Sequence, residues 1–132
     1  LYDPDTIRTI FFTFEESDWE KALEDFHDTD IDVPVTMNVD GKEYSQVGPP
    51  TTGISTYCMV GSGHKRSFNV AIDYVQDQSL YGYKTLNLLN SHEDDSMLGA
   101  VLYSHIARQY IPAAKANLVK VVINGESWGV YA

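Results

Sequence analysis

The dipeptide Asn124-Gly125 restricts the fold of this chain more than any other part of its sequence. It lies between two runs rich in residues typical of β-strands, within the segment Ala116–Tyr131 that reads ANLVKVVINGESWGVY. Asparagine and glycine both tolerate the positive φ angles of a two-residue turn, and such a turn folds its flanking strands back on each other. The sequence therefore predicts an antiparallel β-hairpin here.

The rest of the chain combines further strand patterns with two helix patterns. Asp40-Gly41 is a second hairpin signal, and apolar residues spaced three and four apart indicate helices. The predicted elements are strands at Asp5–Phe14, Val33–Asn38, Glu43–Val47, Arg66–Tyr74 and Lys84–Leu88, and helices at Trp19–His27 and from Asp95 or Ser96 through Tyr110. We therefore predict an α+β fold: a mostly antiparallel sheet of five to seven strands with two helices packed on it.

Composition limits the function classes that this chain can serve. Its residues are 43% hydrophobic, which is enough for one globular domain over residues 1–132. The net charge of −10 argues against nucleic acid or an anionic membrane surface as a partner, because both require a basic surface. No run approaches the roughly twenty apolar residues of a membrane span. Cys58 is the single cysteine, so no internal disulfide is expected.

The irregular segment 48–63, GPPTTGISTYCMVGSG, is rich in glycine and is followed by Lys65. A glycine-rich loop can present backbone N–H groups to a phosphate, and a lysine on the next strand can add a point charge. The residues alone leave another interpretation open. In that interpretation the glycines form turns and Lys65 is a solvated charge at the edge of a strand.

Other catalytic or metal-binding patterns are not legible in the sequence. The histidines are scattered, with no two at the spacing of metal ligands: His27, His64, His92 and His105. Serines lack the pattern of a nucleophile elbow. We therefore predict no catalytic residue and no metal ligand in this chain.

Several motifs occur along the chain in a specific order: Val47-Gly48, Lys65-Arg66-Ser67-Phe68, the run Lys84–Ser91, Asp95-Ser96, Pro112-Ala113 and the segment Ile123–Tyr131. In this order they resemble the N-terminal part of the spore coat protein H (CotH) kinase-like family. The resemblance implies a protein-kinase-like small lobe that faces ATP and Mg²⁺. It assigns nucleotide binding to Gly53, Ser55, Lys65 and Ser67.

Five positions depart from the pattern of that family. Pro50 and Thr52 stand where the family usually has two basic residues, and Ile54 stands in place of an asparagine. These differences remove charge and hydrogen-bonding groups that would hold a triphosphate. Gly99 and Ala100 occupy positions where the family commonly has an arginine and a glutamate or asparagine. A carboxylate partner for Lys65 is therefore not evident from the second helix.

The resemblance also implies catalytic aspartates in a large lobe after the hinge, and this chain ends at Ala132. We therefore expect the nucleotide-facing lobe of a secreted or cell-surface atypical protein kinase, inactive alone and without a tightly bound cofactor. The alternative is a non-catalytic accessory or binding subunit of an extracytoplasmic assembly, which keeps the fold without the chemistry. In both cases we expect the large lobe or a protein partner to cover an apolar face near Trp128 and Tyr131.

Overall fold

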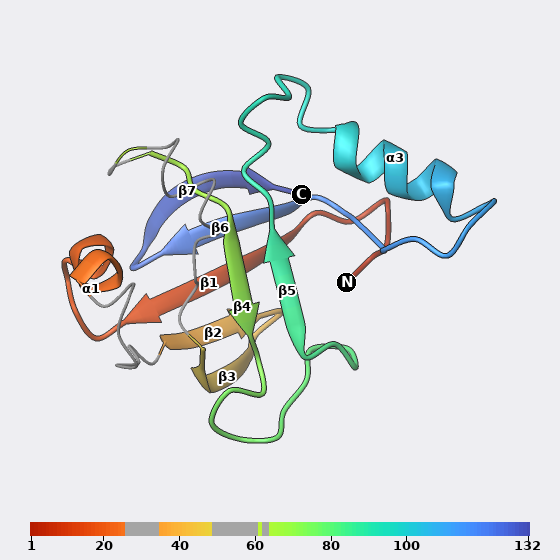
Figure 1. Cartoon of the computed structure of the whole chain (residues 1–132). Coiled ribbons are helices and arrows are strands. Elements are labelled where there is room, and N and C mark those ends of the chain that lie inside the picture. Colours follow the sequence, from red (N-terminus) through yellow and green to blue (C-terminus); the bar gives the residue numbers. More distant parts are fainter. Residues whose placement is uncertain (26–34, 49–60, 62–63) are drawn as a thin grey trace.

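The computed structural model describes residues 1–25, 35–48, 61 and 64–132 (Figure 1). Its elements in chain order are β1 (Arg8–Phe14), α1 (Trp19–Asp25), β2 (Val35–Val39), β3 (Lys42–Val47), β4 (Phe68–Ala71), β5 (Thr85–Leu88), α3 (Gly99–Ala107), β6 (Val119–Ile123) and β7 (Glu126–Tyr131). The described residues thus contain seven strands and two helices. The α+β prediction is confirmed, and each predicted strand is present with bounds that differ by up to three residues at either end.

Five strands form the larger sheet in the order β3-β2-β1-β6-β7. Neighbouring strands are antiparallel except at the centre, where β1 and β6 run parallel with Ile10 opposite Val121. The sheet is therefore mixed, and the prediction missed this parallel pair. Parallel neighbours need a long crossover connection, which the many residues between β1 and β6 supply.

Both hairpin turns are confirmed. Asp40 and Gly41 have φ angles of 53° and 78°, and Asn124 and Gly125 have φ angles of 48° and 81°. Two consecutive residues with positive φ define the turn type whose twist matches that of the flanking strands. The first turn joins β2 to β3, and the second joins β6 to β7.

The strands β4 and β5 form a separate antiparallel sheet, which crosses one face of the larger sheet (Figure 1). Hydrogen bonds join the two sheets at both ends. Gly48 N–H, just after β3, donates to Ala71 O over 2.7 Å. Leu89 and Ala132 exchange a pair of backbone hydrogen bonds of 2.9 and 3.1 Å. The predicted single sheet is therefore two sheets.

The hydrophobic core lies between these two sheets. The larger sheet and the smaller sheet both contribute side chains that are almost completely buried, among them Ile10, Phe12, Met37, Val70, Leu88, Val121 and Ile123. Alternation along each strand explains the arrangement, because successive side chains point to opposite faces. In β1, for example, Phe12 is buried and its neighbour Phe11 is exposed.

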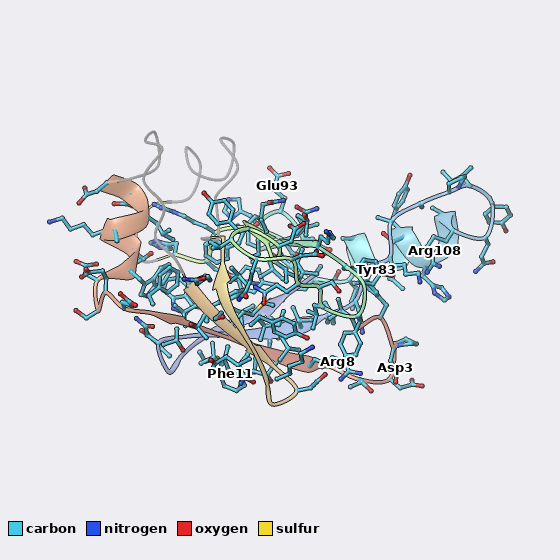
Figure 2. All side chains as sticks on the ribbon, turned by 90° about the horizontal axis from the view of Figure 1, so that it is seen from below. Asp3, Arg8, Phe11, Tyr83, Glu93 and Arg108 are labelled. Atoms are coloured by element: carbon cyan, nitrogen blue, oxygen red, sulfur yellow. The ribbon has the colours of Figure 1, made fainter. Side chains whose placement is uncertain are left out.

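The two helices differ in how they contact the sheets. Trp19 of α1 is buried against Phe14 and Trp128. By contrast, α3 buries none of its residues and extends from the body of the molecule (Figures 1 and 2). The prediction that two helices pack on the sheet is therefore wrong for α3. The small sheet covers one face of the larger sheet, and α3 lies outside the core between them (Figure 1).

The predicted ends of the helices also differ from the observed ones. Within the predicted range Trp19–His27, the described part is helical from Trp19 to Asp25, and the remainder lies outside the described residues. The second helix begins at Gly99 instead of near Asp95. Neither helix of the described residues is long and apolar enough to cross a membrane.

Candidate functional site

Lys65 lies in the segment that leads into β4, three residues before the strand begins at Phe68. Its ammonium group donates a hydrogen bond of 3.2 Å to Asn90 O and a second, short one to Val130 O. The nitrogen also lies 4.5 Å from the centre of the Tyr131 ring. Lys65 therefore links three parts of the chain: the segment before β4, the residues after β5, and the end of β7.

Asn90 fixes the backbone on which Lys65 lies. Its side-chain amide donates to Lys65 O over 2.9 Å, and its backbone N–H donates to Ser67 Oγ over 3.0 Å. Ser67 Oγ in turn donates to Asn90 Oδ1 over 2.9 Å. These bonds hold the segment 65–67 beside the end of β5. Breaking one of these hydrogen bonds would leave a partly buried polar group without a partner, which lowers the stability of the folded protein.

The aromatic ring of Tyr131 lies directly beneath the Lys65 ammonium group. Its side chain is 1% exposed and stacks on Phe68, with the ring centres 5.9 Å apart. Its hydroxyl has no hydrogen-bond partner among the described residues. Burial raises the pKa of Tyr131 far above its ordinary value, so the phenol stays neutral.

Burial also changes the titration of Lys65. Loss of hydration lowers the pKa of its ammonium group, because a charge is less stable away from water. No carboxylate of the described residues forms an ion pair with Lys65. Backbone carbonyls and an aromatic ring are therefore its described partners, and these satisfy the donors without neutralising the charge.

A β-bulge positions the second aromatic residue of this region. Val121 pairs with Gly129 and Val122 with Ser127, so Trp128 is the extra residue on β7. Bulges turn a side chain away from the regular direction of the strand. Trp128 contacts Trp19 of α1 edge to face, with ring centres 5.0 Å apart, and its indole N–H has no partner among the described residues.

Arg66 connects this region to α1. Its guanidinium contacts Glu24 over 3.0 Å, and its side chain is buried. The residue next to Lys65 is thus committed to a structural ion pair. Arginine suits such a place because its charge persists and its planar group donates several hydrogen bonds.

The acidic residues before α3 do not reach Lys65. Asp94 accepts hydrogen bonds from the N–H of Gly99 over 2.6 Å and from the N–H of Ser96 over 3.0 Å. These bonds hold the pKa of Asp94 below its usual value, with the Ser96 side chain as the largest cause. Asp94 is therefore a helix-start residue, where the predicted ones were Asp95 and Ser96.

The predicted site residues divide into two groups. Lys65 and Ser67 lie close together and share Asn90 as a partner. Gly53 and Ser55 lie outside the described residues. Asn90 and Tyr131 were not predicted as site residues, although both belong to the motifs that carried the resemblance. The sequence gives their positions along the chain but not their contacts with Lys65.

The ligand sets that metal ions require can be compared with the described residues. No group of three or more histidine, cysteine, aspartate or glutamate side chains among them could hold a metal ion. Magnesium prefers oxygen ligands, usually one or two carboxylates together with phosphate oxygens. The region around Lys65 supplies a cation, a hydroxyl and an amide, which suit an anion instead.

A separate cleft of about 560 Å³ lies between β5, α3 and the residues before β6. Its lining is mostly apolar and includes Tyr2, Tyr83, Leu86, Ala100 and Ser104. Neither Lys65 nor Ser67, the predicted site residues that lie within the described part of the chain, lines this cleft. The cleft and the Lys65 region are therefore different places on the molecule.

The Tyr131 ring also bears on the partner prediction. Because Tyr131 is buried and Trp128 is packed against the core, these rings do not form an open surface in the described structure. The exposed large apolar residues gather instead on and around α3. Whether a partner covers the region of Trp128 and Tyr131 stays a prediction.

Comparison with known proteins gives one family match. The model of a family described as CotH kinase protein matches residues 60–132. The match includes Lys65, Ser67, Asn90 and the hairpin of β6 and β7, and it begins after Gly53 and Ser55. No curated protein matches the chain.

Proposed function

The chain belongs to the CotH kinase protein family, and from this premise we propose that it is the nucleotide-facing, N-terminal lobe of an atypical protein kinase. The ligand of this lobe is the phosphate chain of ATP. The lobe does not transfer phosphate when it is alone. The observation that carries the proposal is Lys65, a partly desolvated cation held in place by two backbone carbonyls and an aromatic ring.

The hydrogen-bond acceptors of Lys65 support phosphate binding, because a phosphate oxygen can replace them. Carbonyl oxygens of Asn90 and Val130 are neutral acceptors. A phosphate oxygen is charged, and a hydrogen bond between two charged groups is roughly twice as strong as a neutral one. The low hydration that lowers the pKa of Lys65 also strengthens its attraction to an incoming anion.

Ser67 and Asn90 serve as positioning residues in this proposal. They hold the segment 65–67 against the end of β5 through the bonds between their side chains and backbones. A fixed backbone places the Lys65 side chain within a small volume. Less conformational freedom is then lost when a ligand binds.

The absence of catalysis follows from the chemistry that phosphoryl transfer requires. Metal ions bridge the phosphates and neutralise their charge, and carboxylates hold those metals. Among the described residues, no group of three or more histidine, cysteine, aspartate or glutamate side chains could hold a metal ion. In our proposal, the catalytic carboxylates come from a large lobe outside this chain, and the assembled kinase works outside the cytoplasm.

Titration with ATP and MgCl₂, followed by backbone amide NMR, tests this function even when binding is weak. We expect shifts at the amides of Lys65, Ser67 and Asn90. Lys65→Met removes the charge and keeps an aliphatic side chain over the Tyr131 ring. It should weaken binding about tenfold to a hundredfold, as expected for loss of a charge-assisted bond.

Lys84→Met is the matched control, because Lys84 is exposed and pairs with Asp73 and Asp77. It should leave the titration unchanged. Equal binding by the Lys65→Met variant and the original protein would contradict the proposal.

Two observations favour a second candidate, a non-catalytic accessory module. Lys65 already has acceptors for its protons, and the sequence replaces two basic positions and an asparagine of the family loop with Pro50, Thr52 and Ile54. A module of this kind would give no ATP-dependent shifts. It would instead form a stoichiometric complex with another protein in native mass spectrometry.

A further inference from the structure

The strand β5 has an open edge. It belongs to a two-stranded sheet, so β4 pairs with one side of it and no described strand pairs with the other (Figure 1). The consecutive residues Thr85–Leu89 all line the cleft between β5 and α3. Side chains along a strand alternate between its two faces, so an unbroken run of lining residues means that the backbone edge itself faces the cleft.

Hydrogen bonding within the small sheet shows which backbone groups face the cleft. Ile72 N–H donates to Lys84 O over 2.7 Å, and the antiparallel pairing continues from there along β5. In such a pair every second residue directs its backbone groups to the partner strand, and the residues between direct theirs away. The N–H and C=O groups of Thr85, Asn87 and Leu89 therefore point away from β4.

Of these three residues, Leu89 is the one with a backbone partner in the described part of the chain. Leu89 N–H donates to Ala132 O over 2.9 Å, and Ala132 N–H donates to Leu89 O over 3.1 Å. No described residue forms a hydrogen bond with the outward backbone groups of Thr85 or Asn87. A mutual pair such as Leu89 with Ala132 occurs between antiparallel strands. It therefore sets the direction and the register for a strand beside Asn87 and Thr85.

The other sheet edges are covered by side chains. On β3, Gln76 and Gln78 both donate to Ser45 O. On β7, Lys65 donates to Val130 O. An uncovered edge presents unpaired N–H and C=O groups and is a template for pairing with another chain. The outer edge of β5 before its last residues has no such cover among the described residues.

The cleft beside this edge has room for an extended peptide. Its volume of about 560 Å³ lies within the range of roughly 300–1,000 Å³ that is usual for ligand sites. The buried side chains of Leu86 and Leu88 supply apolar contacts on one side, and Ala100 and Ser104 of α3 are small. Among the described residues that line the cleft, Lys115 carries the one charged side chain. This charge disfavours a basic occupant.

We propose that the outer edge of β5 binds an extended segment of another protein as an added antiparallel strand, a function separate from ATP binding near Lys65. Main-chain hydrogen bonds to Thr85 and Asn87 hold the segment, and the alternate side chains give specificity. Residues opposite Thr85 and Asn87 lie on the exposed face of β5, and the residues between them contact Leu86 and Leu88. The segment therefore alternates polar and apolar residues, and it is neutral or acidic.

A labelled synthetic peptide of about six residues tests this by fluorescence anisotropy. It alternates valine and threonine, with glutamate at one polar position, and we expect binding in the micromolar to millimolar range. Methylation of the backbone nitrogens at the polar positions should weaken binding more than about tenfold, because these N–H groups pair with β5. Methylation of the valine nitrogens should have a much smaller effect, because those N–H groups point away from β5.

Two variants at one position test the same edge from the protein side. Asn87→Pro removes the N–H that faces the cleft and leaves the β4 pairing intact, since proline is tolerated at such edge positions. It should weaken binding more than about tenfold. Asn87→Ala is the matched control, because it loses the same side chain, including its bond from Asn69, and keeps the N–H. It should bind like the original protein.

Circular dichroism checks that both variants fold, and the methylated peptides decide the question with the original protein if Asn87→Pro does not. Failure of the unmodified peptide to bind overturns the proposal. So does equal binding of the two methylated peptides, which would indicate an apolar site without strand pairing. A loss of binding in Asn87→Ala as large as that in Asn87→Pro would also contradict it.

Discussion

Lys65 and Tyr131 bring a cation and a phenol into one poorly hydrated place. The ammonium group lies 4.5 Å from the ring centre, so the negative face of the ring attracts it. The ring thereby offsets part of the cost that desolvation imposes on Lys65. The hydroxyl of Tyr131 makes no such contribution, since it is buried without a hydrogen-bond partner among the described residues.

Tyr131→Phe should therefore stabilise the protein, which is unusual for a change in a core. The variant keeps the ring under Lys65 and removes a buried hydroxyl that has lost its hydrogen bonds to water. We expect the free energy of unfolding to rise by about 1 kcal/mol at neutral pH. Urea denaturation measures the difference. A clear loss of stability would show that the hydroxyl has a partner in solution.

The same pair of proteins should differ more at alkaline pH. The pKa of Tyr131 is raised in the folded protein, so its contribution is constant below the unfolded value near 10.0. Above that pH the unfolded chain loses the proton while the folded protein keeps it. The original protein should then lose about 1.4 kcal/mol per pH unit relative to Tyr131→Phe. Equal slopes for the two proteins would contradict this assignment.

At the scale of single residues, the sequence indicated which residues belong to the candidate site better than it indicated which residues contact each other. Lys65 and Ser67 were selected through a motif, and the structure places them beside each other. The role of Asn90 required coordinates, because its bonds cross from the end of β5 to the segment before β4. Such a pairing leaves no periodic signal along the chain.

At the scale of elements, α3 shows how a correct pattern can give a wrong position. Apolar residues at helical spacing predicted a helix, and a helix is present. The pattern also predicted that its apolar stripe packs on a sheet, but Leu102 and Ile106 are exposed. Periodicity defines which face of a helix is apolar. It does not define what lies opposite that face, which depends on where the other elements fold.

Because α3 buries none of its residues, its stability depends on local bonds more than on packing. Asp94 supplies the main one, through the hydrogen bond from Gly99 N–H. Asp94→Ala should destabilise the helix by about 1 kcal/mol, as for the loss of other helix-start carboxylates. Hydrogen exchange at the amides of residues 100–107 should become several-fold faster, whereas the global unfolding midpoint should change little.

Asp95→Ala provides the control for Asp94→Ala, since Asp95 makes no described bond to the helix. Its effect on exchange should be small. If Asp94→Ala lowered the global midpoint as much as a core substitution, α3 would be part of the cooperative core in solution. That result would also argue against the exposure of Leu102 and Ile106 in solution.

At the scale of the whole molecule, the division into two sheets depends on contacts between distant segments. The turns at Asp40-Gly41 and Asn124-Gly125 specify their own hairpins. Nothing local specifies that β6 lies parallel to β1, or that β4 and β5 pair separately over the larger sheet. These pairings allow the apolar faces of all strands to be buried together. That requirement concerns the complete chain and not any single segment.

Leu88 tests whether the two sheets fold as one unit. This side chain belongs to the small sheet, is 3% exposed, and forms part of the shared core. Leu88→Ala should lower the free energy of unfolding by about 2–5 kcal/mol, because it removes buried apolar area and leaves a cavity. Leu89→Ala, at a neighbour that is 44% exposed, should cost less than about 1 kcal/mol.

Two signals in the same denaturation experiment report on the two sheets. Trp19 and Trp128 give fluorescence from the side of the larger sheet that contacts α1, and far-ultraviolet circular dichroism reports on all strands. For a cooperative molecule, Leu88→Ala shifts both transitions together. A tryptophan transition that stays in place while the dichroism transition moves would mean that the larger sheet folds without the smaller one. The small sheet would then unfold separately from the larger one. Lys65 would belong to the less stable part, because it lies three residues before β4 of the small sheet.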